Sequence, residues 1–91
     1  MNFMITFPLK QHGYKERVSR FLESGALPPD GVTMHSRWFT ASHSMGFILA
    51  ETEDVKALFR WMSEWADVVD FTIEPVVTDD EAGPILKEMM G

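Results

Sequence analysis

Cysteine is absent from the 91-residue sequence. The chain therefore has no disulfide framework and no thiolate chemistry. Basic residues are scarce as well: eight lysines and arginines stand against fourteen aspartates and glutamates, which gives a net charge of −6. Nucleic-acid binding needs a basic face, and anionic membranes attract basic segments. The charge balance therefore argues against both nucleic acid and membranes as partners.

Long hydrophobic runs are missing too, and none approaches the ~20 residues that a transmembrane helix needs. The first ten residues, MNFMITFPLK, contain neither a basic leader nor a small-residue cleavage site. We therefore expect no signal peptide and a cytoplasmic protein. The 45% of hydrophobic residues and 24% of charged residues are typical of a globular chain. We expect one domain over residues 1–91, with a modest core that a partner subunit would help to stabilise.

Familiar catalytic and metal-binding motifs are also lacking. The three histidines, His12, His35 and His43, do not have the spacing of metal ligands. There is no glycine-rich phosphate loop and no nucleophile elbow. The acidic run DDE at 79–81 is typical of the start of a helix. We therefore expect no metal and no cofactor.

What the sequence does contain is an alternation of strand and helix patterns. β-branched and aromatic residues predict strands at 2–8, 33–41, 45–51 and 68–77. Between them, apolar residues at helical spacing predict two helices. The order is that of an α+β, ferredoxin-like βαββαβ fold, with a four-stranded antiparallel sheet and both long helices on one face. A short C-terminal helix is expected to start near Gly83–Pro84, because proline is tolerated in a first turn.

The two long helices differ in where their aromatic and charged residues should lie. In the first helix Tyr14 and Phe21 belong to the apolar stripe, Arg17 is expected in water, and Gly25 has the position of a C-cap. In the second helix Trp65 is expected in the core. Trp61 lies further round the helix and is expected at its rim or against a partner.

Side-chain alternation assigns the strand residues to two faces. With a hairpin loop centred on Ser42–His43, Trp38 pairs with Phe47. Residues that we expect against the helices include Met34, Trp38, Phe47 and Leu49. The opposite face then carries Met4, Thr6, His35, Arg37, Phe39, Ile48, Ala50, Thr72, Glu74 and Val76. A face that is both apolar and selectively polar is typical of an interface or a ligand groove.

The segments RWF…GFILAE, FRWMSEWADVVDF and IEPVV, in this order, resemble a family of small bacterial proteins of unknown function. That family is expected to belong to the dimeric α+β barrel superfamily, and the resemblance covers nearly the whole chain. It implies a homodimer whose two sheets face each other around an internal cavity. The superfamily includes quinone-forming monooxygenases, haem-degrading enzymes, lactone isomerases and binding proteins, so it implies no single chemistry. The haem-degrading enzymes hold iron through a histidine on the second helix, which this chain lacks.

His35 and Arg37 are the centre of the candidate ligand site. They are two positions apart on one strand, and Thr6, Phe39, Thr72 and Glu74 share their predicted face. Arg37 could bind a carboxylate or enolate oxygen while His35 moves a proton. Alternatively, Arg37 pairs with Glu74 of the other subunit and His35 packs at the interface.

Three functions remain open on the sequence. The first is a homodimer that binds a small aromatic or anionic metabolite in the barrel cavity. The second is a cofactor-independent monooxygenase or isomerase, which needs only a dry pocket and a few polar groups. The third is a structural or regulatory dimer with a filled interior. A pocket approaching ~300 Å³ with His35 or Arg37 in its wall would favour the first two.

Overall fold

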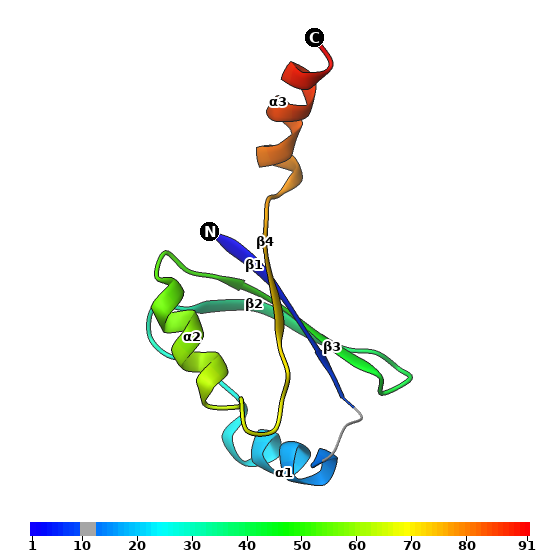
Figure 1. Cartoon of the computed structure of the whole chain (residues 1–91), viewed down its shortest axis with the longest axis vertical. Helices are drawn as coiled ribbons and strands as arrows, with labels where there is room; N and C mark the ends of the chain where they lie inside the picture. The colour runs from blue at the N-terminus through cyan, green and yellow to red at the C-terminus, as the bar shows by residue number, and fades with distance from the viewer. Residues whose placement is uncertain (10–12) are drawn as a thin grey trace.

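The computed structural model describes residues 1–9 and 13–91. The predicted βαββαβ order with a C-terminal helix is confirmed, and it forms an α+β ferredoxin-like arrangement (Figure 1). The strand order is β2-β3-β1-β4, and every neighbouring pair is antiparallel. The elements are β1 (Asn2–Pro8), α1 (Tyr14–Ser24), β2 (Thr33–Phe39), β3 (Met45–Glu51), α2 (Val55–Ser63), β4 (Thr72–Val76) and α3 (Asp79–Met89).

The ends of the elements follow local signals. Gly25 closes α1 in the left-handed conformation at φ 73°, as predicted for a C-cap. α3 begins at Asp79 and not near Gly83–Pro84, because Thr78 and Glu81 form a capping box ahead of it. Pro84 consequently lies inside the helix. The acidic run 79–81 occupies the first turn of α3, as predicted. His12 lies outside the described residues.

The register of the β2–β3 hairpin is confirmed, but the prediction of which of its faces meets the helices is wrong. Trp38 pairs with Phe47, and the backbone N–H of Thr40 donates to the Met45 carbonyl at 2.9 Å. Ile48, however, lies opposite Ile5 of β1, so it faces the helices. The predicted second face therefore loses Arg37, Phe39, Ile48 and Ala50 to the helix side and gains Trp38, Phe47 and Leu49.

A β-bulge explains the positions of Met34 and His35. Met34 pairs with Ala50 and Ser36 pairs with Leu49, so His35 is the extra residue. Met34 therefore stays on the helix side and packs against the core, as predicted, although Trp38 does not. His35 belongs to neither regular row of side chains. Its Nε2 lies 2.7 Å from Glu51 Oε1 on the exposed surface.

The core lies between α2 and the sheet. It consists of Phe3, Ile5, Val32, Ile48, Ala50, Ala57, Leu58, Trp61 and Met62. Trp61 is 1% exposed and lies at its centre, so its predicted rim position is wrong. α2 ends at Ser63, which leaves Trp65 in the turn that follows. α1 adds no apolar side chain to this core, because Arg17 is its only buried residue.

The other side of the sheet has no helix over it among the described residues (Figure 1). We call this side the open face. The register places on it Asn2, Met4, Thr6, Thr33, Ser36, Trp38, Phe47, Leu49, Glu51, Thr72, Glu74 and Val76. Trp38 is 66% exposed there. The open face thus carries a patch of apolar side chains, Met4, Trp38, Phe47, Leu49 and Val76, that no element among the described residues covers.

Candidate functional site

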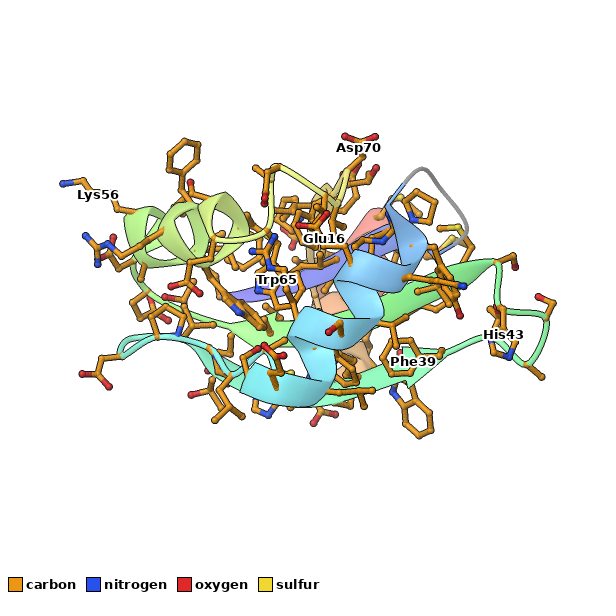
Figure 2. All side chains as sticks on the ribbon, turned by 90° about the horizontal axis from the view of Figure 1, so that it is seen from below. Glu16, Phe39, His43, Lys56, Trp65 and Asp70 are labelled. Carbon is orange, nitrogen blue, oxygen red and sulfur yellow. The ribbon has the colours of Figure 1, made fainter. Side chains whose placement is uncertain are left out.

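A cavity of about 100 Å³ lies between helices α1 and α2 and the sheet. Apolar side chains dominate its wall, among them Phe7, Phe21, Phe39, Ile48, Trp61 and Trp65. Figure 2 shows Trp65 and Phe39 on the two sides of α1. Because α1 contributes so little to the buried core, space remains beneath it, and that space is the cavity.

The aromatic wall depends on close packing between β1 and β3. Gly46 lies opposite Phe7, and a Cβ added to Gly46 would come within 2.3 Å of the Phe7 ring. Only glycine therefore leaves room for this ring. The Phe7 ring meets Phe71 edge to face at 5.7 Å, which extends the wall towards β4. Phe21 meets Phe39 in the same way at 5.8 Å, which joins α1 to β2.

Arg37 brings a positive charge to this apolar wall. Its Nη1 donates to the Ala26 carbonyl at 3.0 Å, and its Nη2 donates to the Gly25 carbonyl at 2.8 Å. Its guanidinium carbon lies 4.8 Å from the centre of the Phe21 ring. Burial lowers the pKa of Arg37. The group is a partly buried cation, and it donates hydrogen bonds to carbonyls at the C-terminal end of α1.

Arg17 is the second cation in the wall, and it was predicted to lie in water. It is 6% exposed, so that prediction is wrong. Its Nη1 donates to the Val68 carbonyl at 3.0 Å, and its Nη2 donates to the Leu9 carbonyl. Arg17 thereby ties α1 to the segments before and after it in the fold. Its position was recognisable in the sequence, because it follows Tyr14 by three residues and precedes Phe21 by four, which places all three on one side of the helix.

The cavity wall therefore has an unusual charge composition for this chain. Arg17 and Arg37 are its only charged members among the described residues, whereas the whole chain has a net charge of −6. None of the described wall residues is a carboxylate that could neutralise Arg37. A largely apolar wall that contains a guanidinium favours a ligand that combines an apolar body with an anionic or carbonyl oxygen.

Tyr14 connects the cavity wall to the β2–β3 hairpin. Its hydroxyl lies 3.4 Å from Nδ1 of His43, which Figure 2 shows in the hairpin loop. His43 has a φ of 62°, a left-handed conformation that histidine adopts more readily than most residues. The sequence suggested a solvated turn residue, and His43 is indeed exposed. The structure adds that its ring faces a residue of the cavity.

The predicted site residues do not form a single cluster. Arg37 and Phe39 line the cavity on the helix side, whereas the register places Thr6, Thr72 and Glu74 on the open face. His35 pairs with Glu51 at the bulge. Since β2 and β4 are the two edges of the sheet, Arg37 and Glu74 are separated both by strands and by face. Sequence reasoning missed Tyr14, Arg17 and Trp61 as members of the site.

Two further kinds of site were sought among the described residues. No group of three or more histidine, aspartate or glutamate side chains is placed to hold a metal ion in this part of the chain. In residues 1–9 and 13–91, no helix is both long enough and apolar enough to cross a membrane.

Fold and cavity together define an α+β ferredoxin-like protein with a small cationic, aromatic pocket. A family described as a domain of unknown function, DUF3303, matches residues 1–90, and the chain belongs to this family. This agrees with the resemblance to a family of unknown function. No curated protein and no solved structure matches the chain.

Proposed function

We propose that the protein binds a small carboxylate with an apolar body in the cavity between its helices and its sheet. The observation that supports this most directly is Arg37, whose guanidinium lies in a largely apolar wall. A guanidinium has five N–H donors. Arg37 donates two of them to the carbonyls of Gly25 and Ala26. Its remaining donors are available for a ligand oxygen.

The size of the cavity limits the ligand. At about 100 Å³ it is of the order of the ~150 Å³ apolar cavity that takes up benzene. It does not reach the ~300 Å³ that was expected above for a pocket that favours ligand binding, which is the size at which sites for drug-sized ligands begin. The ligand body is therefore a single ring or a short branched chain.

Benzoate is a suitable probe, and benzyl alcohol is its uncharged counterpart. The three tryptophan indole N–H signals in an NMR spectrum report where each probe binds. Trp61 and Trp65 line the cavity, whereas Trp38 lies on the open face. We expect benzoate to shift the Trp61 and Trp65 signals and to leave Trp38 in place, with weaker effects from benzyl alcohol. A shift of the Trp38 signal alone would show that benzoate binds at the open face instead. The absence of any shift in the three signals would refute the proposal.

Arg37→Gln tests the role of the charge. The expected result is a loss of benzoate affinity of about tenfold, the effect of one charge-assisted hydrogen bond. Arg60→Gln is the matched control, because Arg60 is an exposed arginine of α2 that does not line the cavity. Since Arg37 also holds two carbonyls, the melting temperature of the unliganded variant is measured alongside. Unchanged benzoate affinity in a folded Arg37→Gln variant would refute this role.

A cofactor-independent isomerase or monooxygenase is the second candidate, and the Tyr14–His43 pair supports it. A phenol beside an imidazole can move a proton next to a bound carbonyl compound. The test is deuterium exchange at the carbon next to the carbonyl of a small ketone in D₂O. Tyr14→Phe should abolish exchange that the wild-type protein catalyses, while leaving the fold intact. Absence of exchange in the wild type would leave binding as the function.

The open face supports a homodimer, the assembly that a dimeric α+β barrel requires. Its apolar members, among them Met4, Trp38, Phe47 and Leu49, form the kind of exposed patch that marks an interface. Two copies packed through these faces would cover them. Light scattering at micromolar concentration should give twice the chain mass of 10.4 kDa. The Trp38→Asp variant should give the mass of a monomer, because dimerisation would bury an unpaired charge in the interface.

A further inference from the structure

α3 has a complete apolar stripe that no element among the described residues of its own chain covers. Ala82, Ile85, Leu86, Met89 and Met90 follow the i, i+3, i+4, i+7, i+8 spacing of one helical face. The last four are 63%, 52%, 71% and 81% exposed, and no residue of α3 is buried. Figure 1 shows α3 standing beyond the end of the sheet, with no other element beside it.

A helix of this length and composition is not stable in isolation. Isolated helices shorter than about 12–15 residues are marginal in water, and α3 has eleven residues. Its interior contains Pro84, which costs about 3 kcal/mol relative to alanine. The capping box stabilises it by only about 1 kcal/mol. The helix therefore needs a surface on which to bury its stripe.

The link to the sheet directs α3 away from its own domain. Only Val77 and Thr78 separate β4 from α3, and Thr78 is held in the capping box. Val77 is itself 63% exposed. Because the link is so short, α3 continues outwards from the end of β4. Its apolar stripe is therefore exposed to contact with another molecule.

The area of the open face argues that this molecule is a second copy. Four strands of up to seven residues cover about 23 Å by 19 Å, or about 440 Å². A stable interface needs about 800 Å² from each partner. Each α3 is about 16 Å long and 10 Å wide. In a two-fold dimer each copy gives one helix and receives one, which raises the area to about 760 Å².

We propose that α3 is an exchanged arm: in the homodimer, the apolar stripe of each α3 packs on the body of the other copy. This rests on the homodimer proposed above. In this arrangement the C-terminal helix serves in dimer assembly, and it takes no part in forming the sheet or the cavity. The helix then becomes part of the interface, and its stripe is buried only when two chains meet.

Sedimentation of charge variants tests the energetic claim. Leu86→Asp should raise the dimer dissociation constant at least tenfold, the effect of one interface residue worth more than about 1 kcal/mol. Lys87→Asp is the matched control, because Lys87 lies on the polar side of the same helix, and it should change the constant less than threefold. Equal constants for Leu86→Asp and the wild type would overturn the proposal.

Photo-crosslinking tests the geometry, and the absence of cysteine makes the label unique. Met89→Cys labelled with a benzophenone maleimide should give a covalent dimer. With a mixture of ¹⁵N-labelled and unlabelled chains, a fraction of the crosslinked peptide pairs should join a labelled chain to an unlabelled one, which a crosslink within one chain never does. Lys56→Cys, on the outer side of α2, should give none. Crosslinks confined to one chain, in a protein that still dimerises and responds to Trp38→Asp, would refute the exchange alone. A wild-type monomer would refute the homodimer as well.

Discussion

Helices α2 and α3 are both amphipathic, yet only α2 lies on a surface of its own chain. α2 buries Ala57, Leu58, Trp61 and Met62 against the sheet, whereas α3 buries no residue at all. α2 is held by tertiary packing, which is the usual source of helix stability in proteins. α3 is held in this chain mainly by its capping box. The comparison shows that an apolar stripe specifies a helix but does not say which molecule covers the stripe.

Two leucines allow this difference to be measured with the same substitution. Leu58 in α2 is 2% exposed and Leu86 in α3 is 52% exposed. Leu58→Ala should lower the free energy of unfolding by about 2–5 kcal/mol, because it leaves a cavity in the core. Leu86→Ala should change it by less than about 0.5 kcal/mol at a dilution where copies dissociate. Urea unfolding followed by circular dichroism gives both values, and similar losses would show that α3 packs within its own chain.

Two glycines show how tightly the sheet and α3 are packed. A Cβ at Gly46 would press on the Phe7 ring, whereas a Cβ at Gly83 in α3 would meet nothing within 4 Å. Gly46→Ala should cost about 1–3 kcal/mol, the usual effect of overpacking. Gly83→Ala should leave global stability within about 0.5 kcal/mol. A neutral Gly46→Ala would mean that the cavity lets Phe7 move aside.

The sequence predicted the elements because their signals are local. The order of strands and helices, the Gly25 cap and the Trp38–Phe47 pairing all depend on residues close together in the chain. The orientation of the hairpin in the sheet depends instead on the pairing of Ile5 with Ile48, which are far apart in sequence. A shift of one residue in that pairing exchanges the two faces. Both rows of the hairpin are apolar, so composition did not decide between them.

The candidate site was predictable only in part for a similar reason. Arg37 was singled out, and its role as a ligand residue stays a prediction, but it lies on the helix side of the sheet. Arg17 was assigned to water because charged residues are rarely buried. The carbonyls of Leu9 and Val68 accept hydrogen bonds from its guanidinium, which offsets part of the cost of its burial. Those acceptors are backbone groups, which no side-chain pattern reveals.

The N-caps of the two helices provide a smaller and more local test. Asp54 caps α2 by accepting from the Lys56 N–H at 2.9 Å, and Thr78 caps α3 by accepting from the Glu81 N–H at 3.2 Å. Either residue changed to alanine should cost about 1 kcal/mol. For Asp54→Ala the loss should appear in global unfolding. For Thr78→Ala it should appear only as faster amide exchange within α3. A global loss from Thr78→Ala would mean that α3 belongs to the cooperative core.

The smallest expected effect is the response of α3 to acid. Hydrogen bonds from the backbone N–H and the hydroxyl of Thr78 to the Glu81 carboxylate lower the pKa of Glu81. Because the folded pKa lies below the unfolded one, this contact stabilises α3 fully above the unfolded pKa. The contribution is lost as the pH falls through the folded pKa. α2 has no such capping box, because its N-cap Asp54 accepts only from the backbone N–H of Lys56.

An NMR titration of the Glu81 carboxyl carbon, with amide exchange in α3 followed in parallel, measures this dependence. Both should change over the same pH range, below the ordinary range of a glutamate. In Thr78→Ala the backbone donor remains and the hydroxyl is lost, so the pKa should rise only part of the way back. An ordinary Glu81 pKa in the wild-type protein would mean that the capping box is not formed in solution. α3 would then lack the local stabilisation that sets it apart from α2, and its helical form would depend on the second copy alone.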